Sequence, residues 1–394
     1  MEFTINQSVL VEGLKAVKGL VAKPGSSNPL LTGILIEADN KEIKLTAGNG
    51  NNFITYGIDI KDHEDCSITK PGAVVWHKTV TDIVNKYKDA TLSFSKNEKD
   101  FTTIKSGADE FEMAGFNATE YPTLADYDSQ NAYTLPGDVF QKLIKRTAFA
   151  ASESDTRPIL SGVQFEFQEE GTLCTCTDSH RMARVKASTT NSNEQSIVVK
   201  AENVKEMAKV FDVTKEIECF LEQDNLLIAK SDNVVFYVRL LEGNYPDVSK
   251  LIPQEFPSRI TLNRNDLLQA VDKVNILSKT SGSATAIRFE LDEKSADLFS
   301  VGDEGTNNVV SLSVAQQDVG KGNANIRVSG LEGDTVETFA FNGRFLQDAL
   351  QAMESTEVMI CIQGPMKPFL IIPKHETDER KMEEIQLILP VRLY

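Results

Sequence analysis

The sequence predicts an α+β fold made of three copies of one domain-sized unit, and the observation behind this prediction is internal repetition. Residues 29–37 read PLLTGILIE, and residues 158–166 read PILSGVQFE. Each segment follows a short strand and a helix whose apolar residues lie three and four positions apart. The same strand–helix pattern occurs a third time, so that its copies span 3–21, 133–151 and 260–278.

Three further features follow these helices in the same order. The first is a hairpin of alternating strands joined by a polar turn, at 29–49, 158–178 and, more weakly, 286–304. The second is another helix, at 76–89, 200–212 and 342–353. The third is a closing strand that contains a proline, at 120–124, 244–248 and 387–391. We therefore expect about eight strands and two helices per unit, with the helices packed on antiparallel sheets, in domains at 1–128, 129–254 and 255–394.

The composition is that of an ordinary globular protein, with 41% apolar and 25% charged residues among 394. No run of about 18 apolar residues is present, so the sequence predicts no membrane span. The N-terminus lacks the basic start and apolar block of a secretory signal. The five cysteines are scattered and odd in number, which argues against a disulfide framework and favours a reducing compartment. We expect a cytoplasmic protein.

The formal net charge is −17, which taken alone disfavours binding to nucleic acid. The charge is unevenly distributed, because the six predicted helices together carry +6 and the rest of the chain therefore carries −23. This distribution predicts a positive helical layer and a negative sheet layer. The alternative is that the helices simply carry lysines on solvated faces.

Two short patterns invite a catalytic interpretation. Asp178 and His180, in the segment TDSHR, could form an acid–base pair, but alternation along a strand would point Ser179 away from both. Cys174 and Cys176 lack partners at zinc-site spacing and are better interpreted as buried thiols. The segment GNGNN at 48–52 is typical of a turn, and no nucleotide-binding motif is present. We predict no metal and no cofactor.

Over its whole length the chain resembles the bacterial DNA polymerase III beta subunit family, the DNA sliding clamps, in the version found in Gram-positive bacteria. The resemblance is carried by four segments in a specific order. They are TLPGDVFQKLIKRTAFAASESDTRPILSGV from 134, CTDSHRMARV from 176, LLEGNYPDVSKLIP from 240 and the terminal LILPVRLY from 387.

The resemblance implies a head-to-tail homodimer in which three clamp domains per chain form a six-domain ring around double-stranded DNA. The clamp would not be an enzyme but would tether the replicative polymerase and read no base sequence. It also implies that the clamp loader and repair proteins bind through short linear peptides. Two alternatives stay open, namely a hydrolase centred on Asp178 and His180 and a clamp relative that only binds peptides. We assign the DNA-facing role to cations of the first helices, Lys15, Lys18, Lys23, Lys142, Lys145 and Arg146.

The resemblance also implies a peptide-binding pocket between the second and third domains. Carried over by motif, its residues are Leu160, Thr177, Ser179, His180, Arg181, Met182, Pro246, Leu251, Asn342, Phe345, Met366, Pro368, Leu387, Leu389, Pro390, Val391 and Arg392. Because Pro390 has no N–H for a strand ladder, we expect the end of the last strand to be free to serve a ligand. At the ring interface the resemblance places Phe111 and Met113 of one chain against Ile276 and Leu277 of the next.

Overall fold

The computed structural model describes residues 1–88, 90–127, 132–191, 194–222, 225–278, 286–292, 308–316, 319–333, 338–374 and 382–392. The chain divides into two compact units. Unit 1 consists of Met1–Phe140 with Lys205–Leu240, and unit 2 of Gln141–Val204 with Leu241–Tyr394. The expected domain boundary at 128/129 lies outside the described residues. The three-domain division by sequence repeat stays a prediction.

The described elements follow one order three times: a strand, a helix, further strands, a second helix and three strands. The closing strands predicted at 120–124 and 244–248 do not form, and the one predicted at 387–391 ends at Ile388. The first copy comprises β1 (Glu2–Asn6), α1 (Gln7–Lys18), β2 (Gly33–Ala38), β3 (Glu42–Gly48), β4 (Asn52–Asp59), β5 (Ser67–Lys70), β6 (Gly72–His77), α2 (Val80–Val84), β7 (Thr91–Lys96), β8 (Phe101–Ser106) and β9 (Asp109–Phe116). The second comprises β10 (Tyr133–Pro136), α3 (Gly137–Thr147), β11 (Gly162–Gln168), β12 (Gly171–Thr177), β13 (Arg181–Ala187), β14 (Gln195–Lys200), α4 (Ala201–Val210), β15 (Glu216–Glu222), β16 (Leu226–Ser231) and β17 (Val234–Arg239).

The third copy comprises β18 (Ser258–Asn263), α5 (Arg264–Ser278), β19 (Ala286–Asp292), β20 (Val309–Gln316), β21 (Gly320–Gly333), β22 (Phe339–Asn342), α6 (Gly343–Ala352), β23 (Glu357–Ile362), β24 (Phe369–Lys374) and β25 (Glu383–Ile388). Each copy therefore has two helices, with nine, eight and eight strands in turn among the described residues. This count confirms the predicted architecture of antiparallel sheets with few helices.

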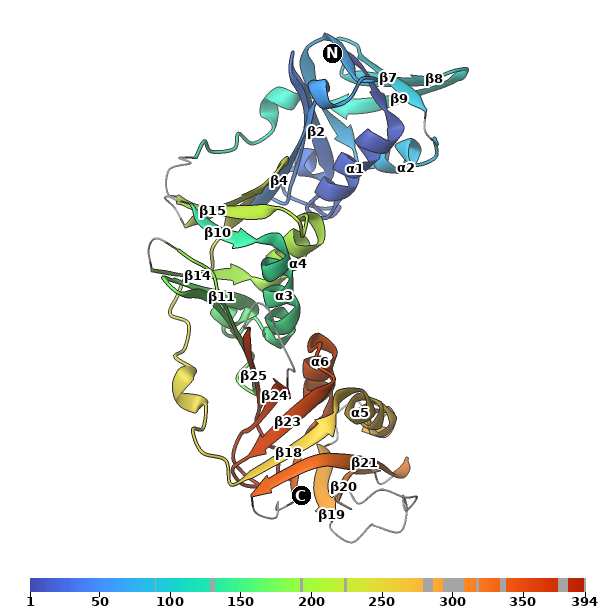
Figure 1. Ribbon diagram of the computed structural model, residues 1–394. Coiled ribbons are helices and arrows are strands. Elements are labelled where there is room, and N and C mark those ends of the chain that lie inside the picture. Colours follow the sequence, from blue (N-terminus) through green and yellow to red (C-terminus); the bar gives the residue numbers. More distant parts are fainter. Residues whose placement is uncertain are drawn as a thin grey trace. The chain divides into compact units, whose positions relative to one another are not determined.

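One sheet runs through each unit and joins strands from two copies of the repeat. In unit 1 the order is β10-β15-β16-β17-β4-β3-β2-β6-β9-β8-β7-β1-β5, and in unit 2 it is β14-β11-β12-β13-β25-β24-β23-β18-β21-β20-β19-β22. The joint in unit 1 is the antiparallel pair β4–β17, and the joint in unit 2 is the antiparallel pair β13–β25. Strand β4 of unit 1 and strand β25 of unit 2 are labelled in Figure 1.

The two joints have the same register. Asn52 pairs with Val238 in unit 1, and Arg181, 129 positions after Asn52, pairs with Ile388 in unit 2. By their place in the repeat, β13 is the counterpart of β4, and β25 is the counterpart of β17. The duplicated sequence therefore builds the same backbone joint twice.

The helices cover the sheets with their apolar faces, as expected for an α+β layer. Helix α1 is capped by Asn6, whose side chain accepts from the Ser8 N–H at 3.0 Å, and the helix buries Leu10 and Leu14. It approaches β3 and β4 so closely that a Cβ on Gly13 would lie 2.6 Å from Leu45 Cδ1. In unit 2, α5 and α6 lie side by side over the sheet and enclose its main apolar core (Figure 1).

Two helices are shorter than predicted, and this changes the charge distribution. The first helix, whose predicted cations include Lys23, ends at Lys18, and the one expected over 76–89 spans only Val80–Val84. The six helices as they form contain ten basic and eight acidic residues, a net charge of +2 rather than the predicted +6. The predicted segregation of charge is therefore much weaker than the sequence tally indicated.

Candidate functional site

A tight turn between β12 and β13 forms the first part of the candidate site in unit 2. Ser179 has a φ of +76°, and the Asp178 Oδ1 atom accepts from the backbone N–H groups of His180 and Arg181, both at 2.9 Å. The Thr177 hydroxyl closes the turn by donating to the Arg181 carbonyl at 2.6 Å. Short polar side chains often stabilise turns in this way. The turn presents Ser179 and His180 to solvent.

Arg181 ties this turn to helix α6. Its side chain is 7% exposed, and it donates to Asp178 Oδ2 at 3.0 Å, to Asp348 Oδ2 at 2.6 Å and to the Phe149 carbonyl at 2.9 Å. The guanidinium also lies 4.6 Å from the centre of the Phe345 ring, a cation–π distance. Because the guanidinium is buried and hydrogen-bonded on several sides, Arg181 holds the wall of the site rather than facing solvent.

The same contacts remove the geometry that a hydrolase would need. Both carboxylate oxygens of Asp178 are engaged by the turn and by Arg181. The exposed His180 ring instead stacks on Phe345, with ring centres 6.5 Å apart and an angle of 19°. A histidine-based hydrolase requires its carboxylate to orient the imidazole toward a nucleophile. Asp178 and His180 do not form such a pair.

The C-terminal strand forms the second part of the candidate site. Met182, Leu387, Leu370 and Cys361 are paired in turn across β13, β25, β24 and β23, and all are buried. Leu389 packs against this row just after β25 ends.

The expectation of a free strand end is wrong for the described residues. The Leu389 N–H donates to the His180 carbonyl at 2.9 Å, and the Val391 N–H donates to the Ala340 carbonyl at 2.8 Å. Pro390 interrupts the ladder, but the chain on each side of it stays tied to the protein. Leu393 and Tyr394, the last two residues of the motif LILPVRLY, lie outside the described residues.

All seventeen residues predicted for the peptide site belong to unit 2, at three levels of burial. The buried ones are Leu160, Thr177, Arg181, Met182 and Leu387. The half-buried ones are Asn342, Phe345, Pro368, Leu389 and Pro390. The exposed ones are Ser179, His180, Pro246, Leu251, Met366, Val391 and Arg392. Three exposed members, Leu251 (58%), Met366 (55%) and Val391 (38%), are among the most exposed large apolar side chains of the described chain.

Hydrogen bonds and ring contacts join some of these residues directly. Thr177, Arg181, His180, Phe345 and Leu389 are connected through the turn and the end of β25. Met366 and Pro368 lie on the turn between β23 and β24, and Asn342 serves mainly as the N-cap of α6.

Sequence reasoning missed two residues that hold this site together. The Tyr245 hydroxyl accepts from the Thr177 N–H at 3.1 Å, and its place beside Pro246 in the motif NYPDV was a signal for it. Asp348 binds Arg181 from a helix 167 residues away, and no local pattern indicates that pairing.

The residues predicted for a ring interface lie on a strand and on a helix, Phe111 and Met113 on β9 and Ile276 and Leu277 on α5. Phe111 is 46% exposed on β9, beside a hollow of about 480 Å³ that Ile83 and Tyr87 also line. Ile276 is 69% exposed near the end of α5, while its neighbour Leu277 packs on the unit 2 core. Strand β9 pairs with β6 only at its last two residues, so within the described chain most of that edge carries no ladder.

The residues predicted to face DNA are divided by the structure. Lys15, Lys18 and Lys23 are exposed in unit 1, and Lys142 is half-buried. Lys145 is exposed but forms a 2.7 Å ion pair with Glu354, which lowers the pKa of that carboxyl group.

The prediction for Arg146 is wrong. Its side chain is only 3% exposed and binds Glu354 at 3.2 Å and the fully buried Glu384 at 3.4 Å. Burial raises the pKa of Glu384, and Gln386 donates to both Glu384 and the Arg146 carbonyl. A buried charge needs such partners, so Arg146 has a structural role and does not face DNA.

Comparison with known proteins identifies the family. Models of the DNA polymerase III beta subunit match in chain order: the N-terminal domain over residues 1–125, the central domain over 134–247 and the C-terminal domain over 249–392. The chain belongs to the DNA polymerase III beta subunit family, the sliding clamps. Among curated relatives, the beta sliding clamps of Bacillus subtilis and Staphylococcus epidermidis are 33% and 31% identical, with all of each chain covered.

Solved clamp structures agree. The Bacillus subtilis clamp (TM-score 0.88, 32% identity) and the Streptococcus pneumoniae DNA polymerase III beta chain (TM-score 0.88, 31% identity) match over the whole of both chains. These matches confirm a Gram-positive type of clamp, a processivity factor rather than an enzyme, and they give no support to the hydrolase alternative. In the described residues no helix is long and apolar enough to cross a membrane, and no cluster of three or more His, Cys, Asp or Glu could hold a metal ion.

The buried pair of Arg146 and Glu384 generates a stability prediction. Arg146→Ala should lower the free energy of unfolding by about 3–5 kcal/mol, because it leaves the buried Glu384 without its cationic partner. Lys145→Ala, which breaks only the exposed pair with Glu354, should cost less than about 1 kcal/mol. Urea titration followed by circular dichroism measures both. Equal losses in the two variants would show that Arg146 is not the structural cation.

Proposed function

We propose that two copies of this chain close head to tail into a ring around double-stranded DNA and tether the replicative polymerase to it. The observation that carries the proposal is a pair of open strand edges at equivalent places in the repeat. Strand β9 is the counterpart of β17 and β25, and β21 is the counterpart of β4 and β13. Three equivalent joints are possible between the repeats. Two of them, β4–β17 and β13–β25, form within the chain. The third would pair β9 with β21, and this pairing is not made within the described chain.

Both edges are suited to a third joint. Over Gly320–Arg327, β21 pairs only with β20, and β18 pairs with it only from residue 328 onward. The stretch Asp109–Ala114 of β9 pairs only with β8. Head-to-tail contacts of this kind close when the rotation between subunits closes, and the family resemblance supplies two as the number of copies. The exposed Ile276 would then enter the hollow beside Phe111.

A ring of this kind needs no base contacts. The exposed Lys15, Lys18 and Lys23 would meet phosphates transiently, with Lys142, while the net charge of −17 disfavours DNA elsewhere on the surface. We also infer that the clamp acts in the cytoplasm, where its family meets DNA, and that the clamp loader and repair proteins share the site used by the polymerase.

The peptide site is proposed at the unit 2 patch, which we define as Leu251, Phe345, Met366, Leu389 and Val391. Phe345 and Leu389 contact the turn that Arg181 and Tyr245 hold in place, and Leu251, Met366 and Val391 are exposed apolar side chains of the same unit. Such a surface suits a short peptide with leucine or phenylalanine anchors, because apolar anchors carry most of the affinity of such contacts. A clamp relative that only binds peptides would share this patch but would not form a ring on DNA.

The ring proposal predicts that Ile276→Asp abolishes the dimer. The new carboxylate would be buried without a partner at the joint, at a cost of several kcal/mol, on the order of 3 or more. Sedimentation velocity should then show monomers. Leu251→Asp, an equally polar change in the same unit, is the control and should stay dimeric. A stable Ile276→Asp dimer at low concentration would place the interface elsewhere.

The patch proposal predicts that Leu251→Asp and deletion of residues 390–394 each weaken binding of a leucine- and phenylalanine-containing polymerase peptide at least roughly tenfold. Val213→Asp is the matched control, since Val213 is 43% exposed in unit 1. Isothermal titration calorimetry measures the affinities, and circular dichroism shows whether the truncated chain stays folded without the Val391–Ala340 hydrogen bond. Unchanged affinity in both variants, or a truncation that unfolds unit 2, would refute the assignment.

The DNA proposal predicts that changing Lys15, Lys18 and Lys142 together to glutamate weakens binding to double-stranded DNA and flattens its salt dependence. The slope of log K against log salt should fall by up to about 0.9 for each phosphate that a lysine no longer neutralises. The control variant changes Lys41, Lys99 and Lys230, which alters the net charge equally. Fluorescence anisotropy over a salt series, repeated with two unrelated DNA sequences, provides the comparison. Equal weakening in both triple variants would mean that the helices do not face the DNA.

A further inference from the structure

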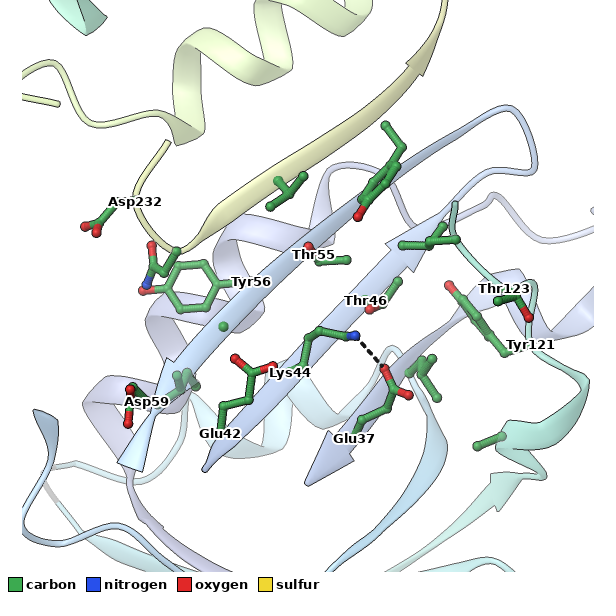
Figure 2. A pocket seen from close by; sticks show the side chains of 18 of the residues that line it. Glu37, Glu42, Lys44, Thr46, Thr55, Tyr56, Asp59, Tyr121, Thr123 and Asp232 are labelled. Atoms are coloured by element: carbon green, nitrogen blue, oxygen red, sulfur yellow. Dashed lines mark ion pairs between the residues drawn. The ribbon is translucent and has the colours of Figure 1, made fainter. Parts of the chain in front are cut away.

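Unit 1 contains a cavity of about 850 Å³ that the clamp function does not use. Side chains of β2, β3, β4 and β17 form its floor, and the segment 118–126 forms one wall (Figure 2). The lining residues Lys44, Thr46 and Thr55 alternate with the core residues of their strands, so the cavity lies mainly on the face of the sheet opposite α1. Its volume is in the range of ligand-binding clefts.

The cavity occupies the joint of unit 1 that is equivalent to the peptide-site joint of unit 2. Beside each joint is the same turn: Asn49 Oδ1 accepts from Asn51 N and Asn52 N at 3.2 and 3.0 Å, as Asp178 does in unit 2. Gly50, with a φ of +98°, stands where Ser179 stands in unit 2. A tyrosine that precedes a proline follows the last strand of the first repeat and of the second repeat. It is Tyr121 in unit 1 and Tyr245 in unit 2.

The two tyrosines differ in their hydrogen bonding. The Tyr245 hydroxyl accepts from the Thr177 N–H. The Tyr121 hydroxyl is buried and has no hydrogen-bond partner among the described residues, and the same is true of the Thr46 hydroxyl. The two side chains are 6% and 1% exposed, and both line the cavity. Figure 2 shows the Tyr121 hydroxyl turned from the wall toward the strands that carry Thr46.

Buried hydroxyls without partners are costly, since each loses its hydrogen bonds to water. Two of them in the wall of one cavity mark positions where a ligand that seats against this wall would gain hydrogen bonds. In the empty protein they should lower stability, and a bound donor group would remove that penalty.

The charge of the residues that line the cavity indicates which chemical group could be this hydrogen-bond donor. Seven acidic residues line it, and its one lysine, Lys44, is already paired with Glu37 at 3.4 Å. The other acidic residues are Glu12, Glu42, Asp59, Asp62, Asp126 and Asp232. Asp59 and Asp232 are paired with lysines outside the lining, Lys61 at 3.9 Å and Lys215 at 3.7 Å. The remaining carboxylates favour a cation by charge complementarity. A guanidinium has five N–H donors and no acceptor, so it could donate to carboxylates and to hydroxyl oxygens together.

We propose that this cavity is a second binding site of the clamp, which takes an arginine-bearing linear peptide from a partner protein. The site differs in chemistry from the unit 2 patch, because it selects charge rather than apolar anchors. It does not depend on ring formation or on the unit 2 patch. A partner with one apolar and one basic motif could use both sites of one clamp chain.

Isothermal titration calorimetry with the full chain tests the proposal. The probe is a capped peptide with two arginines, and its matched control replaces both arginines with citrulline, which has the same shape and no charge. We expect the citrulline peptide to bind at least roughly tenfold more weakly. Glu42→Gln should weaken the arginine peptide about two- to fivefold, whereas Glu98→Gln, the same change outside the cavity, should have no effect.

Tyr121→Phe provides a readout that a purely structural role would not give. It should weaken the arginine peptide about three- to tenfold, yet leave the melting temperature of the free protein equal or higher, because an unpartnered buried hydroxyl has been removed. Thr46→Val should behave in the same way. Binding of the leucine and phenylalanine peptide should be unchanged in all these variants, so failure here is distinguishable from failure of the unit 2 assignment.

Three outcomes would overturn the proposal. The first is no binding of the arginine peptide at millimolar concentration. The second is equal binding of the arginine and citrulline peptides, or equal weakening in Glu42→Gln and Glu98→Gln. The third is tight binding of spermidine without binding of the peptide, which would make the cavity a site for free polyamines.

Discussion

The structure depends on one interaction, the antiparallel backbone pairing that joins consecutive copies of the repeat. In unit 1 it is made by β4 and β17, and in unit 2 by β13 and β25, in the same register. Main-chain hydrogen bonds do not require particular side chains, so the joint survives where the sequences of the copies have diverged. Each compact unit contains one complete joint. Two of the three cuts between the units accordingly fall inside α3 and α4, and the third follows β17.

The alternation of apolar and polar residues made the strands predictable, whereas burial against other elements determined where the helices form. The segment from Trp76 was predicted to be helical, but β6 extends to His77, and Trp76 is fully buried with its indole N–H donating to the Thr102 hydroxyl at 3.0 Å. Burial of a large aromatic side chain in a sheet outweighs local helix propensity. The predicted turn at 48–52 and the buried thiols of Cys174 and Cys176 are confirmed, because each depends on short-range chemistry.

The motifs that make up the candidate site could be predicted from the sequence, but the role of each residue in them could not. The sequence placed Arg146 among the DNA-facing cations and Arg181 in the peptide site, yet each is buried against acidic residues more than 160 positions away in the chain. Counting the charges along a helix treats every cation as exposed to solvent. The count fails where an acidic residue from another element pairs with the cation. The resemblance to clamps pointed to the segment Asp178–His180, which was expected to lie on a strand. The structure shows instead that it is a turn, with Ser179 at a φ of +76°, and that Arg181 fixes it from within.

The two joints also show how duplication separates fold from function. At equivalent places in the register, unit 2 pairs Met182 with Leu387, and unit 1 pairs Phe53 with Tyr237. On the neighbouring strand, Leu173 of unit 2 corresponds to Lys44 of unit 1, 129 positions earlier, and this lysine lines the acidic cavity. The backbone of the joint is the same in both, so these substitutions change the local chemistry without changing the register. A clamp built from repeats can therefore keep an apolar surface at one joint and a charged cavity at the other. The main-chain hydrogen bonds that join the copies form with either set of side chains.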